Sequence, residues 1–229
     1  MRKTKDNKLK VRILLIIGLA ILIIVTVIAF IIRQRNQTQQ VSFEELVRNL
    51  KGDAAWEDNR PEMAVDLLTP NEYSRPQIET EEITGIVIHY TANPGTTAAD
   101  NRGYFEGLKD SGLTYASSHF VVGIEGEIIQ CIPTTEIAYA SNERNGDTIS
   151  IEVCHPDASG KFTNNTYDSL VELTGWLCGY LGVEPENVIR HYDVTGKLCP
   201  LYYVENEKEW IGFKEDVGRW LLNHASIDE

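Results

Sequence analysis

Basic residues are scarce in most of this chain. Residues 40–229 contain 13 Lys and Arg but 33 Asp and Glu, whereas residues 1–39 contain eight basic residues and a single acid. Nucleic-acid binding needs a basic face, so the acidic body argues against nucleic acid as a partner. No internal repeat divides the 229 residues, which are enough for one domain of ordinary size plus an appendage.

The run from Ile13 to Ile32 has no charged residue. As a helix of twenty residues, it would span about 30 Å, the thickness of the hydrocarbon core. Six Lys and Arg precede the run and two follow it closely, which predicts a cytoplasmic basic tail at residues 1–12. A cleaved signal peptide would have a shorter apolar region and a small-x-small site after it, and this chain lacks such a site. We therefore expect an uncleaved, single-pass anchor in the cell membrane, with the rest of the chain outside.

Residues 33–67 are expected to form a tether that includes a short amphipathic helix. The polar residues 34–40 suit a flexible connection. In residues 42–51, Phe43 and the later apolar side chains fall at helical spacing, and Ser42 with Glu45 fits a capping box. A stalk helix without activity is the simplest interpretation. Packing on the domain, pairing with a second copy and lying at the membrane are alternatives, so the oligomeric state stays open.

The remainder, residues 68–229, alternates between predicted strands and helices. Short β-branched runs predict strands at residues 85–90, 119–124, 127–132 and 148–154. Apolar residues at helical spacing predict helices at residues 96–109, 165–181 and 207–224. This alternation predicts an α/β domain with a central mixed β-sheet flanked by helices.

Three residues form a candidate zinc set. His89 lies near the end of the first strand, where α/β sheets place ligands. His191 and Cys199 are separated by a short segment with a Gly turn and Lys197. Two imidazoles and one thiolate leave the fourth tetrahedral position of Zn²⁺ open for water, as a catalytic zinc site requires. Spacing alone leaves a structural role open, because a His and a Cys eight residues apart arise easily by chance.

The other histidines and cysteines carry weaker signals. His119 opens an apolar strand and is either a structural residue of the core or rim or a residue that lines the site, while His155 and His224 are interpreted as surface residues. An extracellular location would permit a disulfide, although pairing cannot be deduced from sequence. We expect buried free thiols at Cys131, Cys154 and Cys178.

Four stretches of the domain occur together in one order: GIVIHYTANPGTTAADNRGYFEGL, SSHFVVGIEGEIIQCIP, ISIEVC and VIRHYDVTGKLCP. From about residue 68 to 222 the chain resembles the zinc-dependent N-acetylmuramoyl-L-alanine amidases related to phage lysins and peptidoglycan recognition proteins. This resemblance implies that peptidoglycan is the substrate, and that the bond between N-acetylmuramic acid and L-alanine of the stem peptide is cut. Some relatives carry a tyrosine where this chain has Ser118, so the resemblance implies no tyrosine role there.

The resemblance also implies roles for five residues. His89, His191 and Cys199 would hold one Zn²⁺ per chain, which lowers the pKa of a bound water and polarises the scissile carbonyl. Glu152 would take the proton from that water and pass it to the departing amine. Lys197 would face the negative charge that grows on the carbonyl oxygen.

Two alternatives remain. The first is a non-catalytic module that binds or senses peptidoglycan on the same fold, but such relatives typically lose the cysteine ligand, which Cys199 provides here. The second is a cysteine hydrolase with a Cys-His pair. A Cys-Pro step after a basic residue, together with two separate histidines, suits metal ligation better than a thiolate pair.

Overall fold

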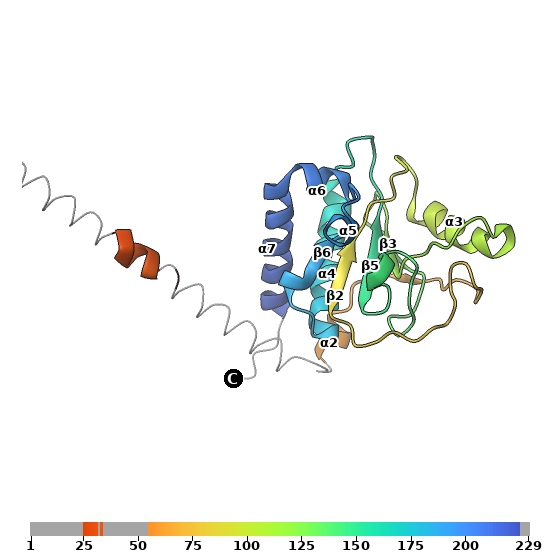
Figure 1. Cartoon of the computed structure of the whole chain (residues 1–229), viewed down its shortest axis with the longest axis horizontal. Coiled ribbons are helices and arrows are strands. Elements are labelled where there is room, and N and C mark those ends of the chain that lie inside the picture. Colours follow the sequence, from red (N-terminus) through yellow and green to blue (C-terminus); the bar gives the residue numbers. More distant parts are fainter. Residues whose placement is uncertain (1–24, 32, 34–54, 225–229) are drawn as a thin grey trace, which may run out of the picture. The chain divides into compact units, whose positions relative to one another are not determined.

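The computed structural model describes residues 25–31, 33 and 55–224 (Figure 1). The chain divides into two units, Met1–Leu46 and Val47–Glu229, and each is considered by itself. In the first unit, residues 25–31 are helical. Within the described ranges, no helix is both long enough and apolar enough to cross a membrane. The basic tail, most of the predicted span at 13–32 and the predicted helix at 42–51 lie outside these ranges.

A six-stranded mixed sheet forms the centre of the second unit, in the order β1-β4-β3-β5-β2-β6. The strands are β1 (Ala64–Val65), β2 (Gly85–Ile88), β3 (Phe120–Val122), β4 (Ile128–Gln130), β5 (Thr148–Val153) and β6 (Val188–Arg190). Only the β3–β4 pair is antiparallel, whereas all other neighbours are parallel. The predicted mixed α/β architecture is confirmed, and β5, β2 and β6 run side by side in the same direction.

The three long helices are α3 (Ala98–Ser111), α4 (Asn164–Leu181) and α7 (Glu207–His224), near the predicted positions. Thr97 caps α3 through a capping box, and Thr163 caps α4 by accepting from a backbone N–H. Such caps satisfy donors that the first helical turn leaves free. Shorter elements are the helices α2 (Ala55–Asp58), α5 (His191–Thr195) and α6 (Leu201–Glu205), and the 3-10 turns η1 (Asn142–Arg144) and η2 (Pro185–Asn187).

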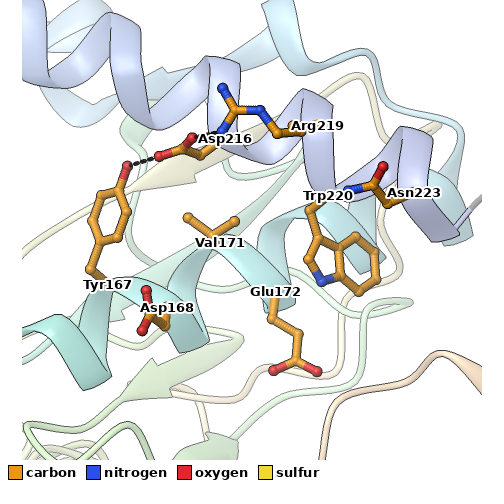
Figure 2. A pocket seen from close by; sticks show the side chains of 8 residues that line it. All are labelled: Tyr167, Asp168, Val171, Glu172, Asp216, Arg219, Trp220 and Asn223. Atoms are coloured by element: carbon orange, nitrogen blue, oxygen red, sulfur yellow. Dashed lines mark hydrogen bonds and ion pairs between the residues drawn. The ribbon is translucent and has the colours of Figure 1, made fainter.

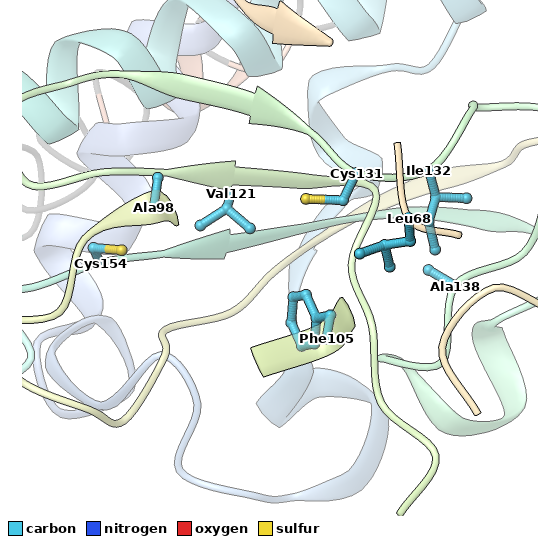
Figure 3. Close-up of a cluster of buried hydrophobic side chains, with 8 residues drawn as sticks. All are labelled: Leu68, Ala98, Phe105, Val121, Cys131, Ile132, Ala138 and Cys154. Carbon is cyan, nitrogen blue, oxygen red and sulfur yellow. The ribbon is translucent and has the colours of Figure 1, made fainter. Parts of the chain in front are cut away.

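Helices cover both faces of the sheet. In Figure 1, α4 and α7 lie on one side and α3 lies on the other. Figure 2 shows the side chains that line a groove between α4 and α7, where Tyr167 donates a hydrogen bond of 2.7 Å to Asp216. Beneath α3, a cluster of buried side chains joins the helix to the sheet (Figure 3). Its members are Leu68, Ala98, Phe105, Val121, Cys131, Ile132, Ala138 and Cys154.

The cysteines carry no disulfide. All four are free and buried, which confirms the expectation for Cys131, Cys154 and Cys178. Burial disfavours the thiolate and raises the pKa of Cys131 and of Cys154 to about 12. These thiols therefore act as small apolar side chains in the core.

The described end of the predicted tether packs on the domain. Trp56 of α2 is 1% exposed, and its carbonyl accepts a hydrogen bond of 2.7 Å from the Trp176 indole. A Cβ on Gly179 would lie 2.4 Å from the Trp56 ring, so a glycine is needed for this approach. Strand β1 also precedes residue 68 and pairs with β4. Residues 55–67 thus contribute to the packed unit.

Candidate metal centre

The site forms where three parallel strands end. Ile88 of β2 pairs with Ile151 of β5 on one side and with Arg190 of β6 on the other. Residues that pair side by side in parallel strands point to the same face of the sheet, and so do the residues that follow them. These following residues are His89, Glu152 and His191. Strand register therefore brings three of the five predicted site residues to one edge and one face.

Cys199 completes a cluster with the two histidines. One ligand atom from each of His89, His191 and Cys199 lies within 4.8 Å of the others, and all three residues are buried. His89 Nδ1 lies 3.9 Å from Cys199 Sγ. The chain reaches this position by turning after α5 at Gly196, which has a φ of 77°, and the Tyr192 N–H holds the Cys199 carbonyl at 2.9 Å. Residues that lie 110 positions apart in sequence are thus brought together.

The donor set fits a zinc ion. His191 Nδ1 is buried and has no hydrogen-bond partner among the described residues, so its lone pair is available. Burial, helped by the Lys197 charge, lowers the pKa of both His89 and His191, and the neutral imidazole is the form that binds metal. Burial raises the pKa of the Cys199 thiol to about 12, and a coordinated cation would displace its proton.

Glu152 stands beside His89 on the neighbouring strand. Its Oε2 atom is buried and lacks a hydrogen-bond partner in the described part of the chain. Burial raises the pKa of Glu152 to about 8, and the Lys197 charge opposes this effect. A carboxyl group that can gain and lose a proton near neutral pH suits general acid–base chemistry.

Lys197 follows the Gly196 turn and is exposed. Its charge lowers the pKa of Glu152 and of all three cluster residues. The ammonium group is therefore electrostatically coupled to the whole site.

His119 lies in the core rather than in the site. Its Nδ1 accepts from the Ser150 backbone N–H at 3.0 Å, and its Nε2 lies 2.8 Å from the Glu136 carbonyl. Both ring nitrogens are thus used. Ser118 is also structural, because its hydroxyl donates to the carbonyl groups of Phe120 and Ser150.

The interpretation of His155 as a surface residue is wrong, because this residue is 1% exposed. Its Nδ1 lies 2.7 Å from the Asp157 carbonyl, and its ring centroid lies 5.1 Å from that of Tyr90. This contact with the polar segment that follows is one that composition alone does not reveal. His224 is exposed as predicted, although its ring stacks on Trp220 at 3.9 Å.

Sequence reasoning missed two residues that contact the site histidines. Ser141 Oγ lies 3.2 Å from His89 Nε2, and Asn142 Oδ1 lies 3.0 Å from His191 Nε2. Both belong to the segment between β4 and β5, which has no motif. The only available signal was the run of polar residues at 141–145.

Known proteins are similar to this chain in sequence. The family model described as N-acetylmuramoyl-L-alanine amidase matches residues 79–201. N-acetylmuramoyl-L-alanine amidase CwlL of Bacillus licheniformis is 33% identical over 166 residues, which cover 67% of this chain and 46% of that protein. N-acetylmuramoyl-L-alanine amidase BlyA of Bacillus subtilis (strain 168) is 32% identical, with 64% of this chain and 44% of that protein covered. The chain thus spans about half the length of the curated relatives it matches.

Solved structures share the fold. The catalytic domain of XlyA is 26% identical and superposes with a TM-score of 0.59, covering 69% of this chain and 99% of that one. PlyL is 25% identical with a TM-score of 0.59, and the match covers 69% of this chain and 97% of PlyL. Nearly the whole of each of these chains therefore corresponds to the domain described above.

Proposed function

Because this chain belongs to the N-acetylmuramoyl-L-alanine amidase family, we propose that it is a zinc-dependent peptidoglycan hydrolase. The bond cleaved would join the lactyl group of N-acetylmuramic acid to L-alanine of the stem peptide. One observation carries the proposal: a buried His89, His191 and Cys199 cluster stands beside a buried carboxyl oxygen of Glu152 that has no hydrogen-bond partner among the described residues. A metal-binding set and a proton acceptor are the two components that hydrolysis of an amide requires.

Each site residue has a role in this proposal. His89, His191 and Cys199 hold one Zn²⁺, which supplies Lewis acidity toward water and toward a carbonyl oxygen. Glu152 accepts the proton of the attacking water and hands it to the departing amine. The Lys197 charge favours the ionised form of Glu152 that starts the reaction and stabilises the negative charge on the carbonyl oxygen.

Removal of the metal tests the zinc requirement. The full chain in detergent would be incubated with purified peptidoglycan, and newly exposed alanine amino groups would be counted. We expect a strong chelator to abolish their release and added Zn²⁺ to restore it. Activity that survives complete zinc removal would contradict the metal site. Binding without cleavage at full zinc occupancy would instead indicate a non-catalytic peptidoglycan-binding module.

A Glu152→Gln variant tests the proton acceptor. It should keep its zinc and lose turnover by about 10²–10⁴-fold, the usual contribution of general acid–base catalysis. Glu172→Gln is the matched control, because Glu172 is exposed on α4. Wild-type turnover in Glu152→Gln would remove the assigned role.

The location of the enzyme forms a second part of the proposal. The charge-free run at 13–32 and the basic residues before it support a single-pass anchor with the catalytic domain outside the cell. The substrate, a cell-wall polymer, would then lie within reach. We expect the protein in the membrane fraction, with the domain accessible to protease added outside intact cells from which the wall has been removed. A soluble, released form would contradict the anchor.

A further inference from the structure

We propose that residues 139–145, termed here the orienting loop, position both zinc-binding histidines through the adjacent residues Ser141 and Asn142. This inference rests on the proposed function, because it concerns the same metal centre. It adds two positioning residues, which lie between β4 and β5 and not beside the candidate ligands in the sequence. Neither would touch the metal or the substrate, and both would act by fixing which nitrogen of each ring is free to bind.

Asn142 sets the orientation of His191. Its amide oxygen Oδ1 lies 3.0 Å from His191 Nε2. An amide oxygen only accepts hydrogen bonds, so Nε2 must carry the hydrogen of the neutral ring. The lone pair is then on Nδ1, the atom that is buried without a partner among the described residues. The Asn142 contact thus selects the tautomer that presents Nδ1 to a metal.

Ser141 has the same relation to His89. Its hydroxyl lies 3.2 Å from Nε2, and Ser141 is itself 1% exposed. The opposite ring nitrogen, Nδ1, lies on the side of Cys199 Sγ, at 3.9 Å. With the hydroxyl oxygen as acceptor, Nε2 carries the hydrogen and Nδ1 faces the cluster. Both histidines would therefore bind the metal through Nδ1, while Nε2 of each ring contacts one residue of the orienting loop.

Hydrogen bonds and an ion pair stabilise the orienting loop in the conformation that makes these contacts. Asn145 Oδ1 accepts from the backbone N–H groups of Ala140 and Ser141, at 3.1 and 2.6 Å. Arg144 forms an ion pair of 2.8 Å with Asp147, immediately before β5. Within this frame the backbone of Asn142 is left-handed, with a φ of 54°. Such backbone is uncommon outside glycine, although asparagine tolerates it, and it occurs here at a residue that contacts a candidate ligand.

The left-handed backbone permits a clean test. An Asn142→Gly variant keeps the loop conformation, because glycine adopts a positive φ without steric cost, but it loses the amide oxygen. We expect its zinc affinity to fall by about 10–100-fold, the usual effect of removing an outer partner of a ligating histidine. Asn142→Asp keeps an acceptor oxygen in the same place and should restore most of that affinity. Ser141→Ala should weaken zinc binding in the same range.

The measurements are made on the full chain in detergent. Zinc dissociation constants come from competition with a chromogenic chelator, and Co²⁺ substitution reports ligand geometry through its visible absorption. Asn142→Gly should shift the Co²⁺ spectrum while its zinc-free form unfolds at the wild-type temperature. Asn223→Ala, an exposed change on α7, should leave affinity and spectrum unchanged.

The outcomes separate this inference from the function on which it rests. If Asn142→Gly binds zinc as tightly as wild type and gives the same Co²⁺ spectrum, the orienting role is refuted while the metal centre stands. The same holds if Asn142→Asp binds as weakly as Asn142→Gly. If the wild-type chain binds no zinc at all, both the metal centre and the orienting role are refuted.

Discussion

Acid should destabilise the domain through His119, which is buried in the core. Nδ1 accepts from the Ser150 N–H, and Nε2 can donate to the Glu136 carbonyl. Protonating Nδ1 would set a new donor against the Ser150 N–H and leave it only the Ser150 hydroxyl, at 3.0 Å, as an acceptor. Burial accordingly lowers the pKa of His119 from 6.5 to about 4.

The direction and size of the effect follow from that shift. The unfolded chain takes up a proton at pH values where the folded chain does not, so stability falls with decreasing pH. The contribution of His119 is complete above about pH 6.5, is reduced by about 2 kcal/mol at pH 5, and is lost through pH 4. The full loss is about 3 kcal/mol, a large part of the stability of an ordinary domain.

A His119→Gln variant isolates this effect. Its amide can accept from Ser150 and donate to Glu136 but does not titrate in this range. Urea unfolding would be followed from pH 7.5 to 4.5 by tryptophan fluorescence, since all four tryptophans lie between residues 56 and 220. The difference in unfolding free energy between wild type and variant cancels the other titrating groups. It should change by about 2 kcal/mol between pH 7 and pH 5. A constant difference would refute the reasoning, and so would a His119 proton resonance that titrates near pH 6.5.

Changes at Gly179 and Tyr167 test the packing of α4, and a change at Gly107 in α3 serves as a control. Gly179→Ala places a methyl group where the Trp56 ring lies, 2.4 Å away, so we expect a loss of about 1–3 kcal/mol in thermal unfolding. Gly107→Ala in α3 meets nothing within 4 Å and should stabilise by about 0.5–1 kcal/mol; equal effects of these two changes would contradict the packing argument. Tyr167→Phe removes the hydrogen bond to Asp216 in the α4–α7 groove (Figure 2) and should cost about 1 kcal/mol. An unchanged urea midpoint would show that this partly exposed bond contributes nothing.

The long elements of the domain could be predicted because their signals are local. The helix predicted at 207–224 has those bounds in the structure, and the strand predicted at 148–154 ends one residue earlier. Strand β1 could not be predicted, because two exposed residues, Ala64 and Val65, have no periodicity and are ordered by pairing with β4. Helices α5 and α6, of five residues each, are likewise too short for an apolar stripe to identify them.

In the candidate site, too, only residues with a local sequence signal could be predicted. His89 could be predicted from its place at the end of a buried strand. The grouping of His191 and Cys199 with it depended on family resemblance, because chain spacing leaves a chance pairing open. Ser141 and Asn142 could not be predicted, since their contacts depend on where the segment between β4 and β5 crosses the sheet edge.

The register of β5 against β2 places the candidate metal ligand His89 beside Glu152, the proposed proton acceptor. Glu152 pairs with Val121, a member of the cluster beneath α3, and lies beside His89. Successive residues of a strand alternate between faces, so a slip of one residue would turn Glu152 toward the α4 side. The core opposes such a slip, because Ile151 and Val153 are fully buried on that opposite side and would have to exchange with a carboxylate. Apolar packing therefore fixes the position of Glu152, while the separate orienting loop fixes the histidine rings. Glu152 variants should therefore change turnover at constant zinc affinity, whereas Asn142 variants should change the zinc affinity itself. These two measurements distinguish a defect at Glu152 from a defect in the orientation of the histidine rings.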